Sequence, residues 1–285
     1  MMRSLYNGIT GLQTQQQVMA VISDNIANVS TPGFKNATVD FANVLNSSIN
    51  AASGYSTGTF HINQVGNGAR IVGVKYDWAQ GSIEASTRVT DLAISGGGFF
   101  RLNEDGVYFY SRAGNFNFDI AGNLVNPDEL VVQGYDLTGQ TLPLPEPPGI
   151  APADINVDLA QYTNISVDDD GVMYAIDTTI LPGDPGYGEP VAIWQVALFE
   201  FDNIDGLAKL GDNLWAETTE SGAAQDGVPG RGNLGEVLPY SVETSNVDIA
   251  EEFVSLIVTQ RAYDANAKVI TTSDEMLQTL VNIKR

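Results

Sequence analysis

The sequence predicts an α+β fold in which two long terminal helices flank a β-rich middle. Three observations support this fold class. Apolar residues near both ends recur at alternating intervals of four and three residues, and short apolar runs in the middle alternate with turn-forming residues. In addition, 43% of the 285 residues are hydrophobic, which is ordinary for a folded protein. The chain is therefore long enough for one or two domains with a real hydrophobic core.

The first helix is expected within residues 1–35. Its apolar stripe has a heptad-like spacing with polar interruptions. The stripe consists of Leu5, Ile9, Leu12, Met19 and Ile26, with Gln16 and Ser23 at the two intervening positions. Thr31-Pro32-Gly33 ends the helix, because proline cannot continue it and biases the preceding residue away from helical geometry.

The second helix is expected within residues 246–285. Ser245, followed three residues later by Asp248, resembles a capping box at its start. The four-three stripe continues along the helix through Ile249, Phe253, Leu256, Tyr263, Ala267, Ile270, Leu277 and Val281, with Gln260 and Asp274 as polar members. Such a helix would be about 55 Å long at about 1.5 Å per residue.

The two helices are expected to pair, and neighbouring subunits are expected to cover what the pair leaves open. The second helix carries more apolar surface than one partner helix can bury. The surplus residues are Val254, Ile257, Val258, Val269, Met276, Leu280 and Ile283. The sequence therefore predicts intersubunit contacts along both terminal helices.

The middle of the chain is expected to form β hairpins. Asp105-Gly106, Gly122 and Asp170-Gly171 each lie between short apolar runs, which is a strong local signal for a turn between two strands. Residues 191–201 form a further long strand candidate. The prolines at positions 143, 145, 147, 148 and 152 indicate an extended connection.

Composition argues against most chemistry. Thirteen basic and 35 acidic residues give a formal charge of −22, which disfavours nucleic acid and anionic membranes as partners. The chain has no cysteine and a single histidine, His61, so a thiol nucleophile or a multi-histidine metal site is excluded. Residues 168–171 lack the glutamate that a calcium loop needs at its twelfth position, where Thr179 stands. We predict no metal, no cofactor and no enzymatic activity.

Neither a cleavable signal peptide nor a membrane span is indicated by the sequence. Two other classes of protein stay open at this stage. A secreted β-rich hydrolase could use a pair of carboxylates, and a surface adhesin could bind a ligand through the middle of the chain.

Four segments resemble the flagellar rod and hook proteins. Residues 23–35, which read Ser-Asp-Asn-Ile-Ala-Asn-Val-Ser-Thr-Pro-Gly-Phe-Lys, are similar to the N-terminal signature of that family, and they contain the signature residues Asn25, Asn28, Gly33 and Phe34. Residues 91–100 and 111–116 are similar to internal elements of the family, and residues 245–272 to its C-terminal signature. The likeness covers nearly the whole chain and is thinnest between about residues 142 and 190.

The resemblance implies a discontinuous architecture. The terminal helices, residues 1–35 and 246–285, would pair as a coiled-coil inner domain. Residues 36–75 and 232–245 would be connecting segments, and residues 76–231 would form a β-rich outer domain. Such proteins leave the cell unfolded through the flagellar type III export apparatus and polymerise into tubes.

Among these proteins the sequence favours a hook subunit, with a distal rod subunit of the basal body as the alternative. The C-terminal segment looks like short hook proteins, and no Tyr-Gln element follows Phe41. The expected partners are copies of the chain itself, distal rod and hook–filament junction proteins, the hook cap and the export apparatus. The expected location is the extracellular hook or the basal body. The expected assembly interface consists of Leu5, Ile9, Leu12, Met19, Ile26, Phe253, Leu256, Tyr263, Ile270 and Leu277.

Overall fold

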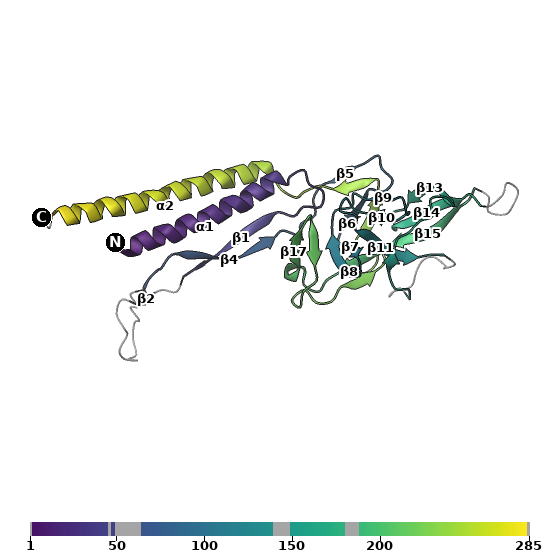
Figure 1. Cartoon of the computed structure of the whole chain (residues 1–285), viewed down its shortest axis with the longest axis horizontal. Helices are drawn as coiled ribbons and strands as arrows, with labels where there is room; N and C mark the ends of the chain where they lie inside the picture. The colour runs from purple at the N-terminus through teal and green to yellow at the C-terminus, as the bar shows by residue number, and fades with distance from the viewer. Residues whose placement is uncertain (1, 45–46, 49–63, 139–148, 180–187, 284–285) are drawn as a thin grey trace. The chain divides into compact units, whose positions relative to one another are not determined.

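A computed structural model describes residues 2–44, 47–48, 64–138, 149–179 and 188–283 (Figure 1). The chain forms two compact units. The terminal unit comprises Met1–Val29, Asn36–Asp77 and Val247–Arg285, and the middle unit comprises Ser30–Lys35 and Trp78–Asn246. His61 and most of the proline-rich connection predicted near residue 145 lie outside the described residues. None of the described helices is long and apolar enough to span a membrane.

The terminal unit consists of two helices and a ribbon of antiparallel strands. Helix α1 covers Met2–Ala27 and helix α2 covers Ile249–Ile283, and the two pack against each other (Figure 1). Strand β1 (Ala37–Asn43) pairs with β4 (Ala69–Tyr76), and both strands pack on α1. The short strands β2 (Ser47–Ser48) and β3 (Gln64–Val65) pair with each other. The segment expected to connect the domains thus supplies strands to the terminal unit.

The middle unit is built from antiparallel strands, as the alternation of apolar runs and turns predicts. Its main sheet has the strand order β13-β14-β15-β11-β7-β8-β18-β17. These strands are β7 (Phe99–Glu104), β8 (Val107–Ser111), β11 (Val131–Asp136), β13 (Tyr162–Val167), β14 (Val172–Asp177), β15 (Pro190–Val196), β17 (Ala208–Gly211) and β18 (Leu214–Ala216).

Shorter strands extend this sheet or pair beside it. Those that join it are β9 (Asn117–Phe118), β10 (Leu124–Val125), β12 (Ala153–Asp154), β16 (Leu198–Glu200) and β19 (Gln225–Gly227). Two separate pairs form between β6 (Leu92–Ser95) and β20 (Glu236–Pro239), and between β5 (Ile83–Ala85) and β21 (Ser241–Glu243). A 3-10 turn covers Ile204–Gly206.

The predicted hairpin turns lie where strands reverse. Asp105 and Gly106 both have positive φ, 49° and 88°, between β7 and β8, and Gly122 and Gly171 turn two further strand pairs. The expectation of one long strand over residues 191–201 is wrong. The segment is interrupted at Ala197, because β15 pairs with β11 and β14 whereas β16 pairs with β7 and β19.

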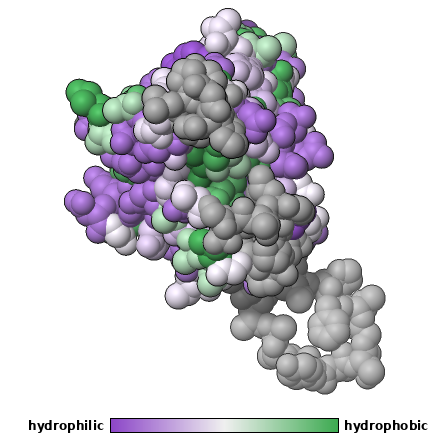
Figure 2. All heavy atoms as spheres, turned by 90° about the vertical axis from the view of Figure 1, so that its right-hand side faces the viewer, coloured by the Kyte–Doolittle hydropathy of each residue, from purple (hydrophilic) through white to green (hydrophobic). Residues whose placement is uncertain are grey.

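A continuous apolar core fills the middle unit. Phe100 and Phe116 are fully buried and meet edge to face with ring centroids 5.1 Å apart. Leu92, Leu124 and Val196 extend the same core, contributed by three different strands or strand ends. Figure 2 shows one face of this part of the chain, on which hydrophobic residues lie near the centre and hydrophilic residues lie to either side. The middle unit thus has the organisation of a self-sufficient domain.

Candidate assembly surface

Helices α1 and α2 approach closely because small residues line their contact. A Cβ atom on Gly8 would lie 2.9 Å from Ile270 Cγ1, and one on Gly11 would lie 2.7 Å from Asn266 Nδ2. The hydroxyl groups of Ser4 and Ser273 are 3.2 Å apart. Larger side chains at Gly8 or Gly11 would therefore push the helices apart.

The buried side of the helix pair is largely polar. Glu252, Thr259 and Ser273 are the buried residues of α2. Asn266, which contacts Gly11 of α1, fills the gap between Thr259 and Ser273, so the four residues are spaced seven apart. On α1 the buried residues are Gly8, Thr14, Ile22 and Asn25. A seven-residue repeat is typical of paired helices, but its members here are small or polar.

Several residues of the predicted stripes directly follow residues of this contact: Ile9 follows Gly8, Leu12 follows Gly11 and Phe253 follows Glu252. Of the ten residues predicted for the assembly interface, none is fully buried, and Ile9 and Phe253 are exposed. Leu5, Leu12, Met19, Ile26, Leu256, Tyr263, Ile270 and Leu277 are half-buried. Ile270 meets α1 at Gly8. The signal that sequence reasoning missed is the four-three spacing of Ser4, Gly8 and Gly11. The assembly role of the ten residues remains a prediction.

Large apolar side chains instead cover the outside of the terminal unit. On α2, the side chain of Phe253 is 50% exposed and that of Val258 is 63% exposed. Further exposed apolar residues of the unit are Tyr6, Phe41, Val72, Val74, Ile249, Val254, Ile257, Val269, Met276, Leu280, Val281 and Ile283. Exposed apolar residues are more typical of a surface that another molecule covers than of one that stays in water.

Asn25, one of the signature residues, joins three segments of the terminal unit. Its amide nitrogen donates to Asn36 Oδ1 (2.7 Å), to the Ala37 carbonyl (2.9 Å) and, more weakly, to Glu252 Oε1 (3.4 Å). Its amide oxygen accepts the backbone N–H of Ala37 at 3.0 Å. Asn36 also donates to Glu252 at 3.2 Å. We call these residues the Asn25 cluster; it links the end of α1, the start of β1 and the first turn of α2.

The other signature residues have local structural roles. Asn28 donates from its amide nitrogen to the Asp24 carbonyl at 2.9 Å, at the C-terminal end of α1. Gly33 has a positive φ of 69°, and a Cβ there would lie 2.5 Å from the Ala113 backbone nitrogen, so only glycine fits. Phe34 is buried in the middle unit, with Lys209 Nζ 4.6 Å from its ring centroid.

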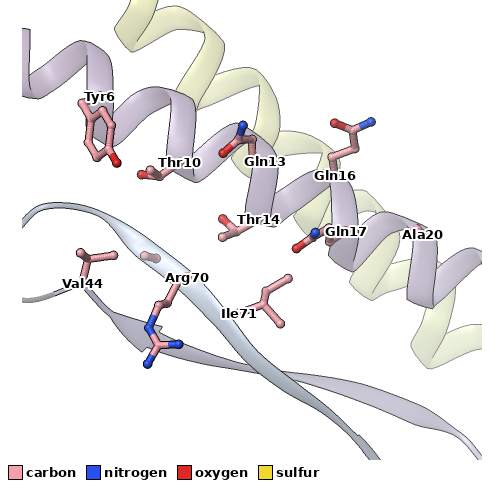
Figure 3. Close-up of a pocket in the computed structure, with 11 residues that line it drawn as sticks. Tyr6, Thr10, Gln13, Thr14, Gln16, Gln17, Ala20, Val44, Arg70 and Ile71 are labelled. Atoms are coloured by element: carbon pink, nitrogen blue, oxygen red, sulfur yellow. The ribbon is translucent and has the colours of Figure 1, made fainter.

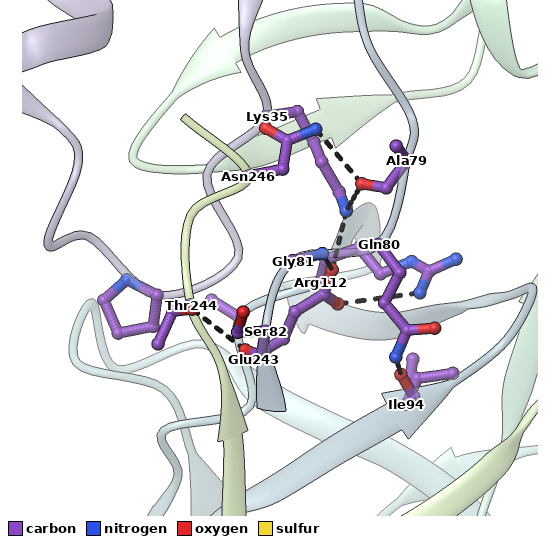
Figure 4. A network of polar contacts seen from close by, with 12 residues as sticks. Lys35, Ala79, Gln80, Gly81, Ser82, Ile94, Arg112, Glu243, Thr244 and Asn246 are labelled. Carbon is purple, nitrogen blue, oxygen red and sulfur yellow. Dashed lines mark hydrogen bonds and ion pairs between the residues drawn. The ribbon is translucent and has the colours of Figure 1, made fainter. Parts of the chain in front are cut away.

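A buried ion pair anchors Lys35, the last residue of the N-terminal signature (Figure 4). Lys35 Nζ donates to Glu243 Oε1 at 2.6 Å and to the Ala79 carbonyl at 2.9 Å, and both charged side chains are almost completely buried. The Gly81 N–H donates to the same Glu243 oxygen at 2.9 Å. Because burial removes the water that would solvate these charges, the pair depends on both partners being present.

Arg112 adds a second positive charge to this pair. Its Nη1 atom lies 3.6 Å from Glu243 Oε2, and its guanidinium lies 5.2 Å from the ring centroid of Phe99. Burial lowers the pKa of Arg112, and the Glu243 carboxylate opposes that shift. We call Lys35, Glu243 and Arg112 the Glu243 cluster. It ties Gly33–Lys35 to the strand that precedes α2, since the Gly33 N–H donates to the Glu243 carbonyl at 2.8 Å.

A polar groove runs between α1 and the β1–β4 ribbon (Figure 3). It encloses about 700 Å³. Tyr6, Thr10, Gln13 and Gln17 line it from α1, and Arg70 lines it from β4 (Figure 3). The lining offers hydrogen-bonding groups but no arrangement of nucleophile, base and acid. Across the residues that the structure describes, no group of three histidine, cysteine or acidic side chains could hold a metal ion.

Comparisons with known proteins agree with this picture of a structural subunit. Residues 5–35 match the family profile described as flagella basal body rod protein, residues 93–175 match the flagellar hook protein FlgE/F/G D1 domain, and residues 239–283 match the flagellar basal body rod FlgEFG protein C-terminal region.

Several relatives that align with nearly the whole chain are named as flagellar rod or hook proteins. The flagellar basal-body rod protein FlgG of Bacillus subtilis is 36% identical over 288 residues, covering all of both chains. FlgG of Buchnera aphidicola from Acyrthosiphon pisum is 38% identical, covering 98% of this chain and 99% of the relative. The flagellar hook protein FlgE of Borreliella burgdorferi is 28% identical over an alignment of 442 residues that covers both chains.

The chain therefore belongs to the flagellar rod and hook protein family, whose members are structural components of the flagellum and not enzymes.

Within this family the comparisons favour the rod over the predicted hook subunit. The rod relatives are more similar and align over nearly this chain's own length, whereas the alignment with the hook relative is much longer than this chain and so contains insertions. The preference for a hook rested largely on the C-terminal segment. That segment matches a profile shared by FlgE, FlgF and FlgG, so it cannot separate rod from hook.

Proposed function

We propose that this chain is a structural subunit of the flagellar basal-body rod, in its distal part, where many copies polymerise into a tube. The single observation that carries the proposal is its likeness, over nearly its full length, to several proteins named basal-body rod protein. The apolar outer surface of the terminal unit supports polymerisation, because a rod subunit must bury such surface against its neighbours.

In this proposal the two units have different tasks. The terminal unit forms the inner part of the tube, with α1 and α2 paired as a coiled coil, and the middle unit forms the outer part. The predicted interface residues, from Leu5 and Ile9 on α1 to Leu277 on α2, then contact neighbouring copies. Their partial or full exposure in the single chain supports this role.

The proposed partners are further copies of the chain, adjoining rod and hook proteins, the cap present during assembly and the flagellar export apparatus. The proposed location is the flagellar basal body. The acidic composition also fits a surface that does not bind nucleic acid.

Electron microscopy of hook–basal bodies from the bacterium that makes this chain tests the proposal. Gold-labelled antibodies raised against the middle unit should decorate the straight rod, and deletion of the gene should remove the distal rod and everything outside it. Decoration of the curved hook would instead favour a hook subunit. No decoration of either structure would refute a role in this axial assembly.

A further inference from the structure

A short stretch of the chain, Ser30–Lys35, packs within the middle unit although the rest of that unit is Trp78–Asn246. Residues 36–77, which belong to the terminal unit, separate the two stretches in the sequence. The short stretch is therefore held in the middle unit by non-covalent contacts, as a bound peptide would be.

This stretch contains a turn that shapes it for binding. The Phe34 N–H donates to the Thr31 carbonyl at 3.3 Å, and Pro32 and Gly33 occupy the two central positions of the turn. Gly33 has a φ of 69°, so the residue types and the backbone match a type II turn, which takes proline and then glycine at these positions. A peptide with this sequence loses less conformational freedom on binding than a flexible one.

The middle unit binds the backbone of the turn on both sides. The Pro32 carbonyl accepts a hydrogen bond from Asn213 Nδ2 at 2.9 Å. The Gly33 N–H donates to the Glu243 carbonyl at 2.8 Å. A Cβ atom on Gly33 would lie 2.8 Å from Ala113 Cα, so the middle unit accepts only glycine here.

The next two side chains of the stretch are both enclosed. Phe34 is 3% exposed, and Lys209 Nζ lies 4.6 Å from its ring centroid. Lys35 Nζ donates to Glu243 Oε1 at 2.6 Å and to the Ala79 carbonyl at 2.9 Å. A neutral side chain in place of Lys35 would leave the buried Glu243 carboxylate without this partner, so the contact distinguishes lysine from an uncharged residue of similar length.

The acidic end of this contact is held in place by groups other than the lysine. Glu243 ends strand β21, where it pairs with Ile83 of β5. The Gly81 N–H donates to Glu243 Oε1 at 2.9 Å, and Arg112 Nη1 lies 3.6 Å from Glu243 Oε2. These neighbours orient the carboxylate and keep a positive charge beside it when Lys35 is removed. The site is thus built largely from the middle unit's own longer stretch.

We propose that the middle unit contains a binding site for peptides of the class Pro-Gly-aromatic-Lys, which Pro32–Lys35 fills as a separable ligand. The site recognises each of the four residues by a different feature: a carbonyl acceptor at proline, close backbone at glycine, an enclosed ring at phenylalanine and a buried carboxylate at lysine. The same peptide supplied by a separate molecule can then replace the chain's own stretch. The inference goes beyond the proposed function and does not depend on it, because it concerns a single chain.

A synthetic peptide tests the site in the full-length chain. The peptide spans residues 29–36, is capped at both ends and carries a fluorescent label. Phe34→Ala and Lys35→Ala, made together in the chain, weaken its own stretch and leave the rest of the site unchanged. Fluorescence anisotropy should show that this double variant binds the peptide at least ten times more tightly than the natural chain, whose own stretch competes at a high effective concentration.

A peptide with Lys35→Met is the matched control, because methionine is unbranched and lacks the charge. It should bind the double variant at least ten times more weakly than the natural peptide, since the ammonium group no longer reaches the buried carboxylate. Adding Glu243→Gln to the double variant should remove this preference for lysine.

Near-ultraviolet circular dichroism shows whether the double variant is folded. A folded double variant that binds neither peptide up to about 1 mM, the scale of effective concentration within one chain, would overturn the site, as would equal binding of the two peptides. If the double variant is unfolded alone, the natural peptide should restore its folded spectrum at a concentration at least ten times lower than the Lys35→Met peptide requires, because a ligand stabilises the state that binds it. Failure of the natural peptide to restore the spectrum would also overturn the proposal.

Discussion

The two units of this protein use their hydrophobic residues in opposite ways. The middle unit buries its large side chains, and Phe99, Phe100, Phe116 and Phe199 are all at most 1% exposed. The terminal unit keeps small and polar residues such as Gly8 and Asn25 in its interior and leaves many of its large apolar side chains outside.

This difference indicates where each unit obtains its stability. Burial of apolar surface is the main favourable term in folding, so the middle unit can be stable within a single chain. The terminal unit gains less free energy from apolar burial, because many of its large apolar side chains stay exposed until another surface covers the helices. A two-stranded ribbon such as β1–β4 adds little on its own. We infer that the terminal unit gains most of its stability from neighbouring copies.

The largest expected effect comes from opening a cavity in the middle unit. Phe100→Ala should lower the free energy of unfolding by about 3–5 kcal/mol, because the side chain is fully buried and the cavity cannot close completely. Phe253→Ala is the matched change on the terminal unit, and it should alter the stability of the free chain by less than about 0.5 kcal/mol. Urea unfolding measures both. Equal losses of unfolding free energy in the two variants would contradict the claim that the middle unit buries its large side chains to greater effect than the terminal unit.

The Glu243 cluster provides a second comparison. Lys35→Ala leaves the buried Glu243 carboxylate with the more distant Arg112 as the remaining positive charge of the cluster, so we expect a loss of about 3 kcal/mol. Lys75→Ala removes an exposed pair with Asp40, whose atoms are 2.8 Å apart, and should cost between about 0 and 1 kcal/mol. A loss from Lys35→Ala as small as that from Lys75→Ala, measured by urea unfolding, would show that the buried pair does not hold the middle unit together.

The Asn25 cluster should matter less for stability than for the pairing of the helices. Asn25→Ala leaves both backbone groups of Ala37 without their partner, at a cost of about 1–3 kcal/mol. Asn28→Ala is the control, since that side chain makes exposed hydrogen bonds. Circular dichroism during thermal unfolding should show an earlier loss of helix for Asn25→Ala alone. Identical helix melting in the two variants would contradict a structural role for Asn25.

High pH should weaken the middle unit. Burial raises the pKa of Tyr110 to about 12, and burial together with the hydrogen bond to Asp226 raises the pKa of Tyr135. Below about pH 10 both phenols are neutral in the folded and unfolded states, so their stabilisation is fully present. Above about pH 10 the unfolded chain loses protons first, and stability falls as the pH approaches about 12.

Tyr110→Phe should flatten this decline when the urea midpoint is measured between about pH 8 and pH 11.5. Tyr108→Phe is the control, because Tyr108 is exposed on the same strand. A decline that both variants leave unchanged would rule out Tyr110 as its source.

Much of this architecture could be predicted from the sequence. Apolar periodicity located both terminal helices, and the Asp105-Gly106 turn located the β7–β8 hairpin, because these signals depend on residues that are neighbours in the chain. The break between β15 and β16 at Ala197 could not be predicted, since it depends on strand partners that are far away in the sequence.

The helix contact illustrates a different limit. Pattern analysis assumes that the largest apolar residues face the nearest helix, and it therefore placed the stripe on Leu5, Ile9 and Leu12. In the structure α2 also meets the small residues Gly8 and Gly11, which lie beside that stripe, and it does so through Ile270 and Asn266. A protein that polymerises has two kinds of partner, the other helix of its own chain and the neighbouring copies. Periodicity alone cannot say which apolar face serves which partner.

Hydrogen exchange on the free chain and on assembled rods tests the central claim most directly. In the free chain, backbone amides of α1 and α2 should exchange at least about 100-fold faster than those of β7 and β11, because the helices lack their intersubunit cover. In the assembled rod, the helices should become protected to a level similar to that of the middle unit. Equal protection of helices and strands in the free chain would contradict the claim that the terminal unit depends on its neighbours.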